Sequence, residues 1–284
     1  MLDLSGIASN INLDPAEGVW NSSIVSAVSY PEDDNEICFA VEDNSFWFAH
    51  RNQCILSAVR LFPPPGPFFD IGGGNGYVAK ALQDNGFEVV LVEPGPAGAR
   101  NARRRGVAHV VRSTLKDAGF RTGTLPGVGL FDVVEHIEDD RGFLSDVRSY
   151  VVDGGRVYIT VPAFQRLWAH EDVEAGHWRR YNLAQICGLV KDCGFEVEYS
   201  TYFFQFLLLP IYLFRALPYS VGIPPKKNVE VRVHKDHHIT NPAALRIIGW
   251  LSSRELTSVA SRRRIGLGAS CLVVARKSGR APGR

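Results

Sequence analysis

Several features that would narrow the function quickly are missing from this sequence. The five cysteines are scattered and form no C-x-x-C pair, which argues against a cysteine zinc site and is typical of a reducing cytosol. The formal net charge is only +1, whereas a dedicated nucleic-acid binder usually carries a clear basic excess. The first residues lack the basic start and apolar stretch of a signal peptide. We therefore expect a cytoplasmic protein without a nucleic-acid partner.

A hydrophobic run long enough to cross a membrane is also absent. The strongest apolar segment, Phe203–Leu217, is about fifteen residues long and contains Pro210, whereas a bilayer span needs roughly twenty residues. We interpret this segment as a buried helix that is broken at the proline. Three alternatives stay open: a wall of an apolar acceptor pocket, the surface of a homodimer, and a patch on a membrane surface.

What the sequence does contain is an alternation of short apolar strands with helices. Strands are expected at Phe68–Ile71, Val89–Glu93, His109–Arg112, Val128–Phe131, Gly155–Val161, Glu196–Tyr202 and Ser270–Arg276. Such an alternation is typical of a parallel sheet with helices on both faces. The predicted fold class is α/β: a doubly wound, Rossmann-like, seven-stranded and mostly parallel sheet, with an antiparallel last strand and a helical cap.

The remaining segments are arranged around this core. The lead-in is expected to be loosely structured, with a short hairpin and the acidic run Glu32–Glu36. The insertion before the last strand is expected to cap the substrate, because compact domains rarely carry so long a connection without a purpose. Its polar loop contains His234, His237 and His238. The expected segments are 1–62 (lead-in and lid helix), 63–202 (cofactor-binding core), 203–265 (cap insertion) and 266–284 (last strand and tail).

The most informative stretch is FFDIGGGNGYVAKAL, a short strand, a glycine-rich turn and the start of a helix. Gly72, Gly74 and Gly76 leave the turn without side-chain bulk where a ligand must approach the backbone. Asp70 comes two residues before the first glycine, where a carboxylate suits a cationic ligand and would repel a pyrophosphate. The spacing G-x-G-x-G also differs from the dinucleotide pattern G-x-G-x-x-G.

A second acid supports a nucleoside site. Glu93 ends the strand in EVVLVE, about twenty residues after the turn, and an acid at that place can accept both ribose hydroxyls. Pro94 follows it and is expected to line the adenine.

The pieces DIGGGNG, LVEPG, GLFDVVEHIEDD, GGRVYITVPA and GHWRRYNLAQICGLVKDCGF resemble the class I S-adenosylmethionine-dependent methyltransferases. Within them, the stretch from Phe46 to Lys277 is similar to the ubiquinone-type O-methyltransferase group. The resemblance implies S-adenosylmethionine as the cofactor, with its methionine part facing Phe131 and Asp132. It also implies a polar contact with the adenine amino group, for which Ser113 is the candidate by position.

Three side chains are candidates for orienting the cofactor or moving a proton. Arg51 could pair with the cofactor carboxylate, or face solvent from a helix packed on the core. His136 lies just past the fourth strand and could be a general base, or simply begin the next helix. His177 could be a general base in the loop after the fifth strand.

That loop, WAHEDVEAGHWRRY, also supplies the candidate acceptor-binding residues Trp168, Arg179, Arg180 and Tyr181. The two arginines could bind an acceptor carboxylate or phosphate, or could pair with Glu171, Asp172 and Glu174 to hold the loop. His170, Glu171, Asp172 and His177 could also be drawn as a metal site, but their spacing is not H-E-x-x-H and the acids can be solvated, so no metal site is predicted.

The leading functional prediction is methyl transfer from S-adenosylmethionine to an oxygen or nitrogen of a small molecule, such as a sugar, quinone or secondary metabolite. One alternative is an RNA or protein methyltransferase. Another is a binding module that has kept the cofactor site and lost catalysis.

Overall fold

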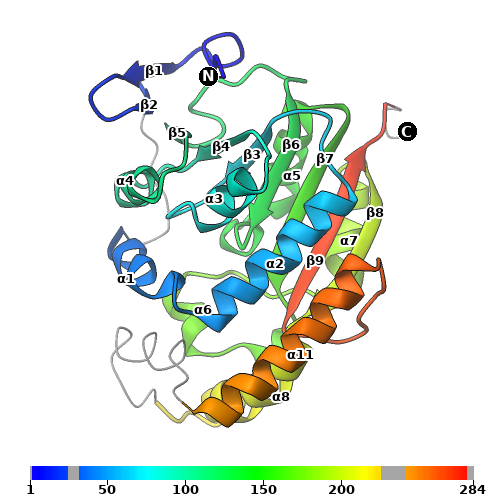
Figure 1. The fold of residues 1–284 in the computed structure, drawn as a ribbon. Helices are drawn as coiled ribbons and strands as arrows, with labels where there is room; N and C mark the ends of the chain where they lie inside the picture. The colour runs from blue at the N-terminus through cyan, green and yellow to red at the C-terminus, as the bar shows by residue number, and fades with distance from the viewer. Residues whose placement is uncertain (1, 25–31, 225–240, 280–284) are drawn as a thin grey trace.

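A computed structural model describes residues 2–24, 32–224 and 241–279. The loop histidines His234, His237 and His238 lie outside these residues. Within them, nine strands form one sheet in the order β1-β2-β5-β4-β3-β6-β7-β9-β8 (Figure 1). The strands are β1 Ile11–Asp14, β2 Val19–Ser22, β3 Phe68–Ile71, β4 Val89–Val92, β5 His109–Arg112, β6 Leu125–Phe131, β7 Val151–Pro162, β8 Phe195–Phe203 and β9 Ser270–Lys277.

The seven strands from β3 onward confirm the predicted sheet. The strands β5, β4, β3, β6 and β7 are parallel, and β9 runs antiparallel to both β7 and β8. Every residue of β3 and β4 is buried, as expected for parallel strands covered on both faces. The strand count was too low by two, because the hairpin β1–β2 extends the sheet by pairing β2 parallel to β5.

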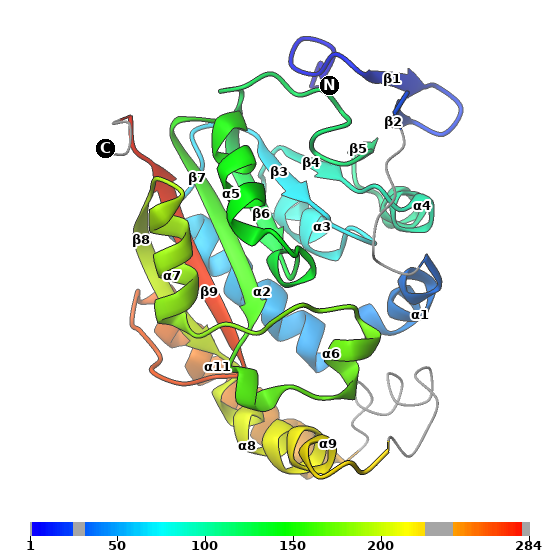
Figure 2. The ribbon, with the colours of Figure 1, turned by 180° about the vertical axis from the view of Figure 1, so that it is seen from behind.

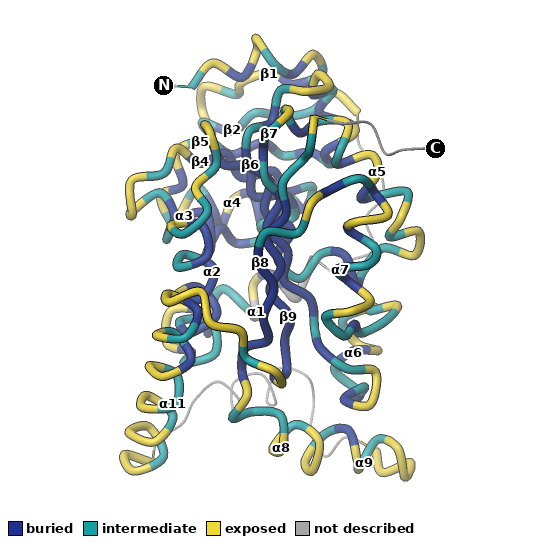
Figure 3. Tube along the Cα trace, turned by 90° about the vertical axis from the view of Figure 1, so that its right-hand side faces the viewer, coloured by how far each residue is buried: buried dark blue, intermediate teal, exposed yellow. Residues whose placement is uncertain are grey.

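Helices cover both faces of the sheet. Figure 3 shows α2, α3, α4 and α11 on one side and α5, α6 and α7 on the other, and Figure 2 shows the second side face-on. The described helices are α1 Glu32–Glu42, α2 Phe46–Leu61, α3 Tyr77–Asp84, α4 Pro96–Arg105, α5 Asp140–Tyr150, α6 His170–Glu174, α7 Leu183–Asp192, α8 Leu208–Ile211, α9 Leu217–Ser220 and α11 Pro242–Ala260.

The lid helix α2 has clear local signals at both ends. The Ser45 hydroxyl accepts hydrogen bonds from the backbone N–H groups of Trp47 and Phe48, which satisfies donors that a helix start leaves unpaired. The prolines at 63–65 end the helix, because proline cannot continue the hydrogen-bond ladder. The lead-in was expected to be loosely structured, and this was wrong for the acidic run Glu32–Glu36, which begins α1.

The interpretation of Phe203–Leu217 as a buried helix was also wrong. After β8 the chain leaves the core and forms α8, a π-helical turn at Tyr212–Ala216 and α9. Phe214 in this segment is 78% exposed, because the segment projects beyond the end of the sheet (Figure 3). Pro210 lies in the first turn of α8, where its missing N–H costs little. No helix in the described part of the chain combines the length and apolarity that a membrane crossing requires.

Candidate functional site

A cavity of about 680 Å³ opens where the carboxyl ends of β3, β4, β5 and β6 meet. This is the edge at which open α/β sheets bind ligands. It gathers eleven of the predicted site residues: Arg51, Asp70, Gly72, Gly74, Glu93, Pro94, Ser113, Phe131, Asp132, His136 and His177. Five other predicted residues do not line it: Gly76, Trp168, Arg179, Arg180 and Tyr181.

The glycine turn is held in place by Glu93. One carboxylate oxygen, Oε2, accepts a hydrogen bond of 2.9 Å from the N–H of Gly74, and Oε1 accepts one of 2.7 Å from the N–H of Gly95. Gly74 has a φ of +52°, which favours glycine. Burial raises the pKa of Glu93, and the two N–H donors oppose that rise. The acid expected at the ribose is therefore also the clamp that shapes the turn.

Gly76 has a different role from the other two glycines. A Cβ there would lie 2.9 Å from the Cβ of Ala102 and 2.9 Å from a methyl group of Val107. Its lack of a side chain therefore lets α3 pack closely against α4. The prediction that Gly76 contacts the ligand has no support in this geometry.

Asp70 is a buried carboxylate beside the turn. The residue is 1% exposed, and no hydrogen bond of good geometry reaches either oxygen from the described residues. Burial raises the pKa of Asp70 to about 7, and the positive charge of Arg51 opposes the rise. The site therefore holds an acid whose ionised form gains from any cation placed next to it.

Arg51 reaches from α2 into the cavity and does not face solvent. Its Nε lies 2.7 Å from Oδ2 of Asp132, and its Nη2 donates a 3.0 Å hydrogen bond to the carbonyl of Phe131. Thr160 donates a 3.0 Å hydrogen bond to the other carboxylate oxygen of Asp132. These contacts tie the lid helix to the end of β6.

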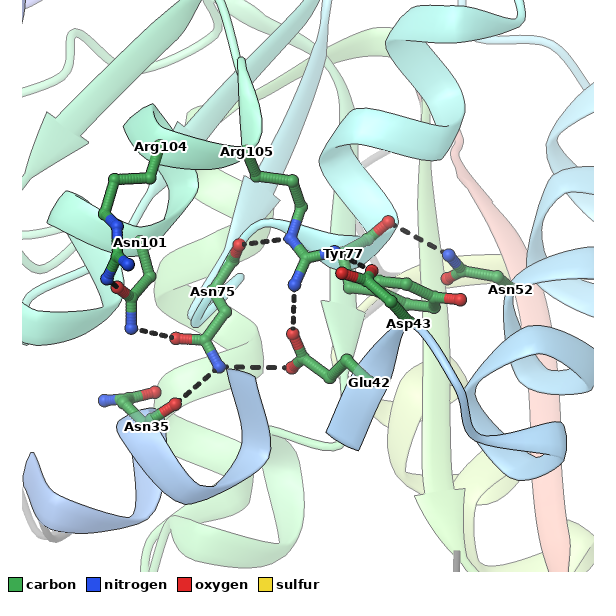
Figure 4. A network of polar contacts seen from close by, with 9 residues as sticks. All are labelled: Asn35, Glu42, Asp43, Asn52, Asn75, Tyr77, Asn101, Arg104 and Arg105. Carbon is green, nitrogen blue, oxygen red and sulfur yellow. Dashed lines mark hydrogen bonds and ion pairs between the residues drawn. The ribbon is translucent and has the colours of Figure 1, made fainter. Parts of the chain in front are cut away.

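Sequence reasoning missed the polar network that joins α1 to the glycine turn (Figure 4). The side-chain amide of Asn75 donates to the carbonyl of Asn35 at 2.8 Å and to Glu42 at 3.2 Å. Arg105, from α4, pairs with the same Glu42 at 2.7 Å. The only signal in the sequence is Asn75 itself, a polar residue inside the glycine turn. The network makes α1 a wall of the cavity.

Two histidines approach each other on the acceptor side of the cavity. The rings of His136 and His177 are 4.7 Å apart. His177 Nδ1 lies 2.8 Å from Asp172, whose carboxylate is fully buried. Burial and the neighbouring His177 lower the pKa of His136 to about 4, so it is neutral near pH 7. The arrangement resembles the pairing of a general base with an orienting carboxylate.

Glu135 adds a carboxylate to this pair. It is completely buried, and burial together with Asp132 raises its pKa well above the ordinary value. The ligand atoms of Glu135, His136 and His177 lie within 4.8 Å of one another, so these residues could hold a divalent ion. The sequence prediction of no metal site considered only the residues of the loop after the fifth strand and did not include Glu135.

The predicted acceptor-binding arginines are both engaged in ion pairs, Arg180 with an acid of its own loop and Arg179 with an acid of α5. Arg180 Nε lies 2.7 Å from Asp172, and Arg179 Nη1 lies 2.7 Å from Asp140. Tyr181 donates a 2.7 Å hydrogen bond to the same Asp140 oxygen. These contacts favour the alternative in which the arginines hold the loop, with Asp140 as a partner that the sequence did not indicate.

The described part of the insertion 203–265 also lies away from the cavity, which none of its described residues lines. It attaches to α2 through a buried contact of 2.9 Å between His50 Nε2 and Glu255 of α11. The same Glu255 carboxylate accepts hydrogen bonds from the N–H groups of Phe204 and Gln205. This geometry anchors the insertion to the lid helix.

Comparisons with known proteins agree with this fold. Residues 48–200, more than half of the chain, match a family model described as a methyltransferase domain. No curated protein matches the sequence.

Among solved structures, a chain in the complex of the Haloferax volcanii Trm112 methyltransferase activator with a methyltransferase is 15% identical, with a TM-score of 0.55 over 89% of this chain and 98% of that one. An S-adenosylmethionine-dependent methyltransferase from Thermotoga maritima is 16% identical, with a TM-score of 0.54 over 87% and 96%. Phosphoethanolamine N-methyltransferase 2 of Haemonchus contortus, in complex with S-adenosyl-L-methionine, is 18% identical, with a TM-score of 0.53 over 90% and 61%.

At these identities the structural similarity shows the fold alone, whereas the match to the family model shows the family. The chain belongs to the methyltransferase domain family, and its fold is that of the class I S-adenosylmethionine-dependent methyltransferases that the sequence predicts.

Proposed function

We propose that this protein transfers a methyl group from its cofactor, S-adenosylmethionine, to an oxygen or nitrogen of a small molecule. The observation that supports this most is the charge of the cavity. Among its described lining residues are four carboxylates, Glu42, Asp70, Glu93 and Asp132, and one guanidinium, Arg51. Glu42 is paired with Arg105 and Asp132 with Arg51, so Asp70 and Glu93 are the acids in excess. This excess favours a cationic ligand. S-adenosylmethionine carries a sulfonium centre and an amino group.

The residues present fit this cofactor. Asp70 offers two buried oxygens that no hydrogen bond of good geometry reaches from the described residues, next to a turn with positive φ values. Glu93 retains acceptor capacity beyond the two N–H groups it already binds, because a carboxylate offers about four lone-pair sites. We assign Asp70 to the amino group, Glu93 to the ribose hydroxyls and Ser113 to the adenine. When bound, the cofactor supplies an activated methyl group.

The chain's own contribution to the chemistry is position and proton removal. Holding an acceptor in line with a reacting centre removes much of the barrier. We assign His177 as the base that takes the acceptor proton on its ring nitrogen, and Asp172 as the residue that orients the ring from Nδ1. The cavity is lined by residues of α1 and α2, and its volume of about 680 Å³ is typical of small-molecule sites, which favours this acceptor class over a polymer.

Calorimetry with S-adenosylmethionine and S-adenosylhomocysteine tests the cofactor site. Glu93→Ala should weaken binding by about 1.5–3 kcal/mol, the range for hydrogen bonds to a charged group. The matched control is Glu88→Ala, an exposed acid at the other end of the same strand, which should bind as the unaltered protein does.

A second measurement addresses turnover. Release of S-adenosylhomocysteine is followed across sugars, quinones and amines, with RNA and protein as further acceptors. Release with a small molecule supports the proposal. Release with RNA or protein alone would show that the acceptor is one of those polymers. Cofactor binding without release under any condition would show that the protein is a binding module that does not catalyse methyl transfer.

A further inference from the structure

The exposed apolar residues of this protein gather at one end. Of the fifteen large hydrophobic residues that are exposed in the described chain, ten lie in residues 208–223 and 242–251. We call these two segments the apolar end. Among its most exposed members are Leu209 (62%), Phe214 (78%), Val221 (63%), Ile247 (59%) and Trp250 (57%). Figures 1 and 3 show both segments beyond the sheet, opposite the hairpin β1–β2. An accumulation of this kind marks a surface for another molecule.

The charge of the apolar end has one sign. Its described residues contain Arg215 and Arg246, and Arg254 follows one turn after the second segment. Neither segment contains an acidic residue, although Arg215 Nε lies 3.9 Å from Oε1 of Glu171. The first acid after the second segment, Glu255, is buried against His50. Arg254 also lies over the ring of Trp250 at 4.9 Å. Cations beside exposed aromatic and aliphatic side chains are the pattern of a surface that meets anionic lipid headgroups.

The first half of α11 exposes a broad face. Residues 245, 246, 247, 249 and 250 are all exposed, and at about 100° per residue they span roughly 200° of the helix circumference, whereas Ala244, Ile248 and Leu251 on the remaining side are half-buried. An apolar face with arginines beside it suits the boundary of an anionic lipid layer. A symmetric contact between two copies would bring arginines of the same surface together. The charge of this face therefore favours lipid over a second copy.

We propose that the apolar end seats this protein on the surface of an anionic lipid layer. Phe214 and Trp250 enter the boundary between headgroups and acyl chains, and Arg246 faces the lipid phosphates. The protein then lies on the membrane without crossing it. This inference rests on the exposed residues of the apolar end and is independent of the proposed methyl acceptor.

Co-sedimentation of the full chain with vesicles tests the proposal. Binding is expected to vesicles of equimolar phosphatidylcholine and phosphatidylglycerol, weaker binding to phosphatidylcholine alone, and a loss of binding as salt is added. The double variant Phe214→Asp/Trp250→Asp should bind roughly tenfold less or weaker still. Arg246→Gln should bind about fivefold less, the factor that corresponds to about 1 kcal/mol per basic residue near the surface.

The matched control is Leu13→Asp, which places the same charge on an exposed residue of β1 at the opposite end and should leave vesicle binding unchanged. Circular dichroism of each variant shows that it is folded. Absence of binding to both kinds of vesicle would overturn the proposal, and so would binding that the double variant retains. Light scattering that shows a dimer, lost in the double variant, together with no vesicle binding would assign the apolar end to a second copy.

Discussion

Replacing Asp70 by asparagine should make the unliganded protein more stable near neutral pH. The carboxyl group is buried without a hydrogen bond of good geometry, and burial raises its pKa from 3.8 to about 7. A raised pKa means that the folded protein holds this proton more tightly than the unfolded chain does. Asp70 therefore lowers the stability progressively as the pH rises from 3.8 to about 7, and above that its full cost is present.

The size of the effect follows from the two pKa values. At about 1.4 kcal/mol per pH unit, the interval corresponds to about 4 kcal/mol. Asparagine has nearly the same shape and cannot ionise, so it avoids this cost. Asp70→Asn and the unaltered protein should have similar free energies of unfolding below about pH 3, where the carboxyl is largely protonated in both states. At about pH 8 the variant should be more stable by up to about 4 kcal/mol.

Urea unfolding followed by circular dichroism measures this difference at several pH values. Asp146→Asn, which alters an exposed acid on α5, is the control and should follow the unaltered protein. In the same preparations Asp70→Asn should bind S-adenosylmethionine more weakly, since the cavity loses a negative charge. A stability difference that does not change with pH would refute the burial argument. A variant that gains stability and keeps full cofactor affinity would remove Asp70 from the binding site.

Three other substitutions probe separate parts of the structure. Gly74→Val should abolish measurable cofactor binding in calorimetry, because φ is +52° there and the residue lines the cavity; Gly86→Val, at a φ of +87° with open space around it, should cost stability and leave binding intact. Asp172→Asn should lower kcat about tenfold or more with little change in KM if it orients a catalytic His177, and equal rates would exclude that role. Glu255→Ala should lower the free energy of unfolding by roughly 2–4 kcal/mol, because the N–H groups of Phe204 and Gln205 lose their acceptor, and Glu255→Gln should lose less.

The sequence predicted the core well because its signals are local. FFDI and VVLV are continuous apolar runs beside a glycine turn, so strand, turn and helix can be recognised within about fifteen residues. The carboxyl ends of parallel strands meet at one edge, which is why Asp70 and Glu93 could be assigned to one site from their positions, while Asp132 was added by the family resemblance.

The features that the sequence did not predict depend on contacts between distant segments. The pairing of Glu42 with Arg105 joins residues far apart in the chain, and α1 carries no motif that announces its place over the turn. Whether Arg179 and Arg180 bind an acceptor or hold the loop depends on which acids lie near them. Asp140, the partner of Arg179, lies in α5, so the sequence of the loop could not reveal it. The exposure of Phe214 could not be read from its neighbours either, because an apolar run looks the same whether protein or another surface covers it.

The departures from ordinary packing gather where the ligand is proposed to bind. Asp70 and Glu135 are buried carboxyl groups with raised pKa values. Asp132, whose charge adds to the rise at Glu135, adopts a φ of +58° that is unfavourable for a residue with a side chain. Each of these lowers the stability of the unliganded protein. A cation near Asp70 would recover part of that cost, so the same residues that weaken the fold strengthen binding. The affinity for a cationic cofactor should therefore rise as Asp70 ionises, over the same pH interval in which the stability of the unliganded protein falls.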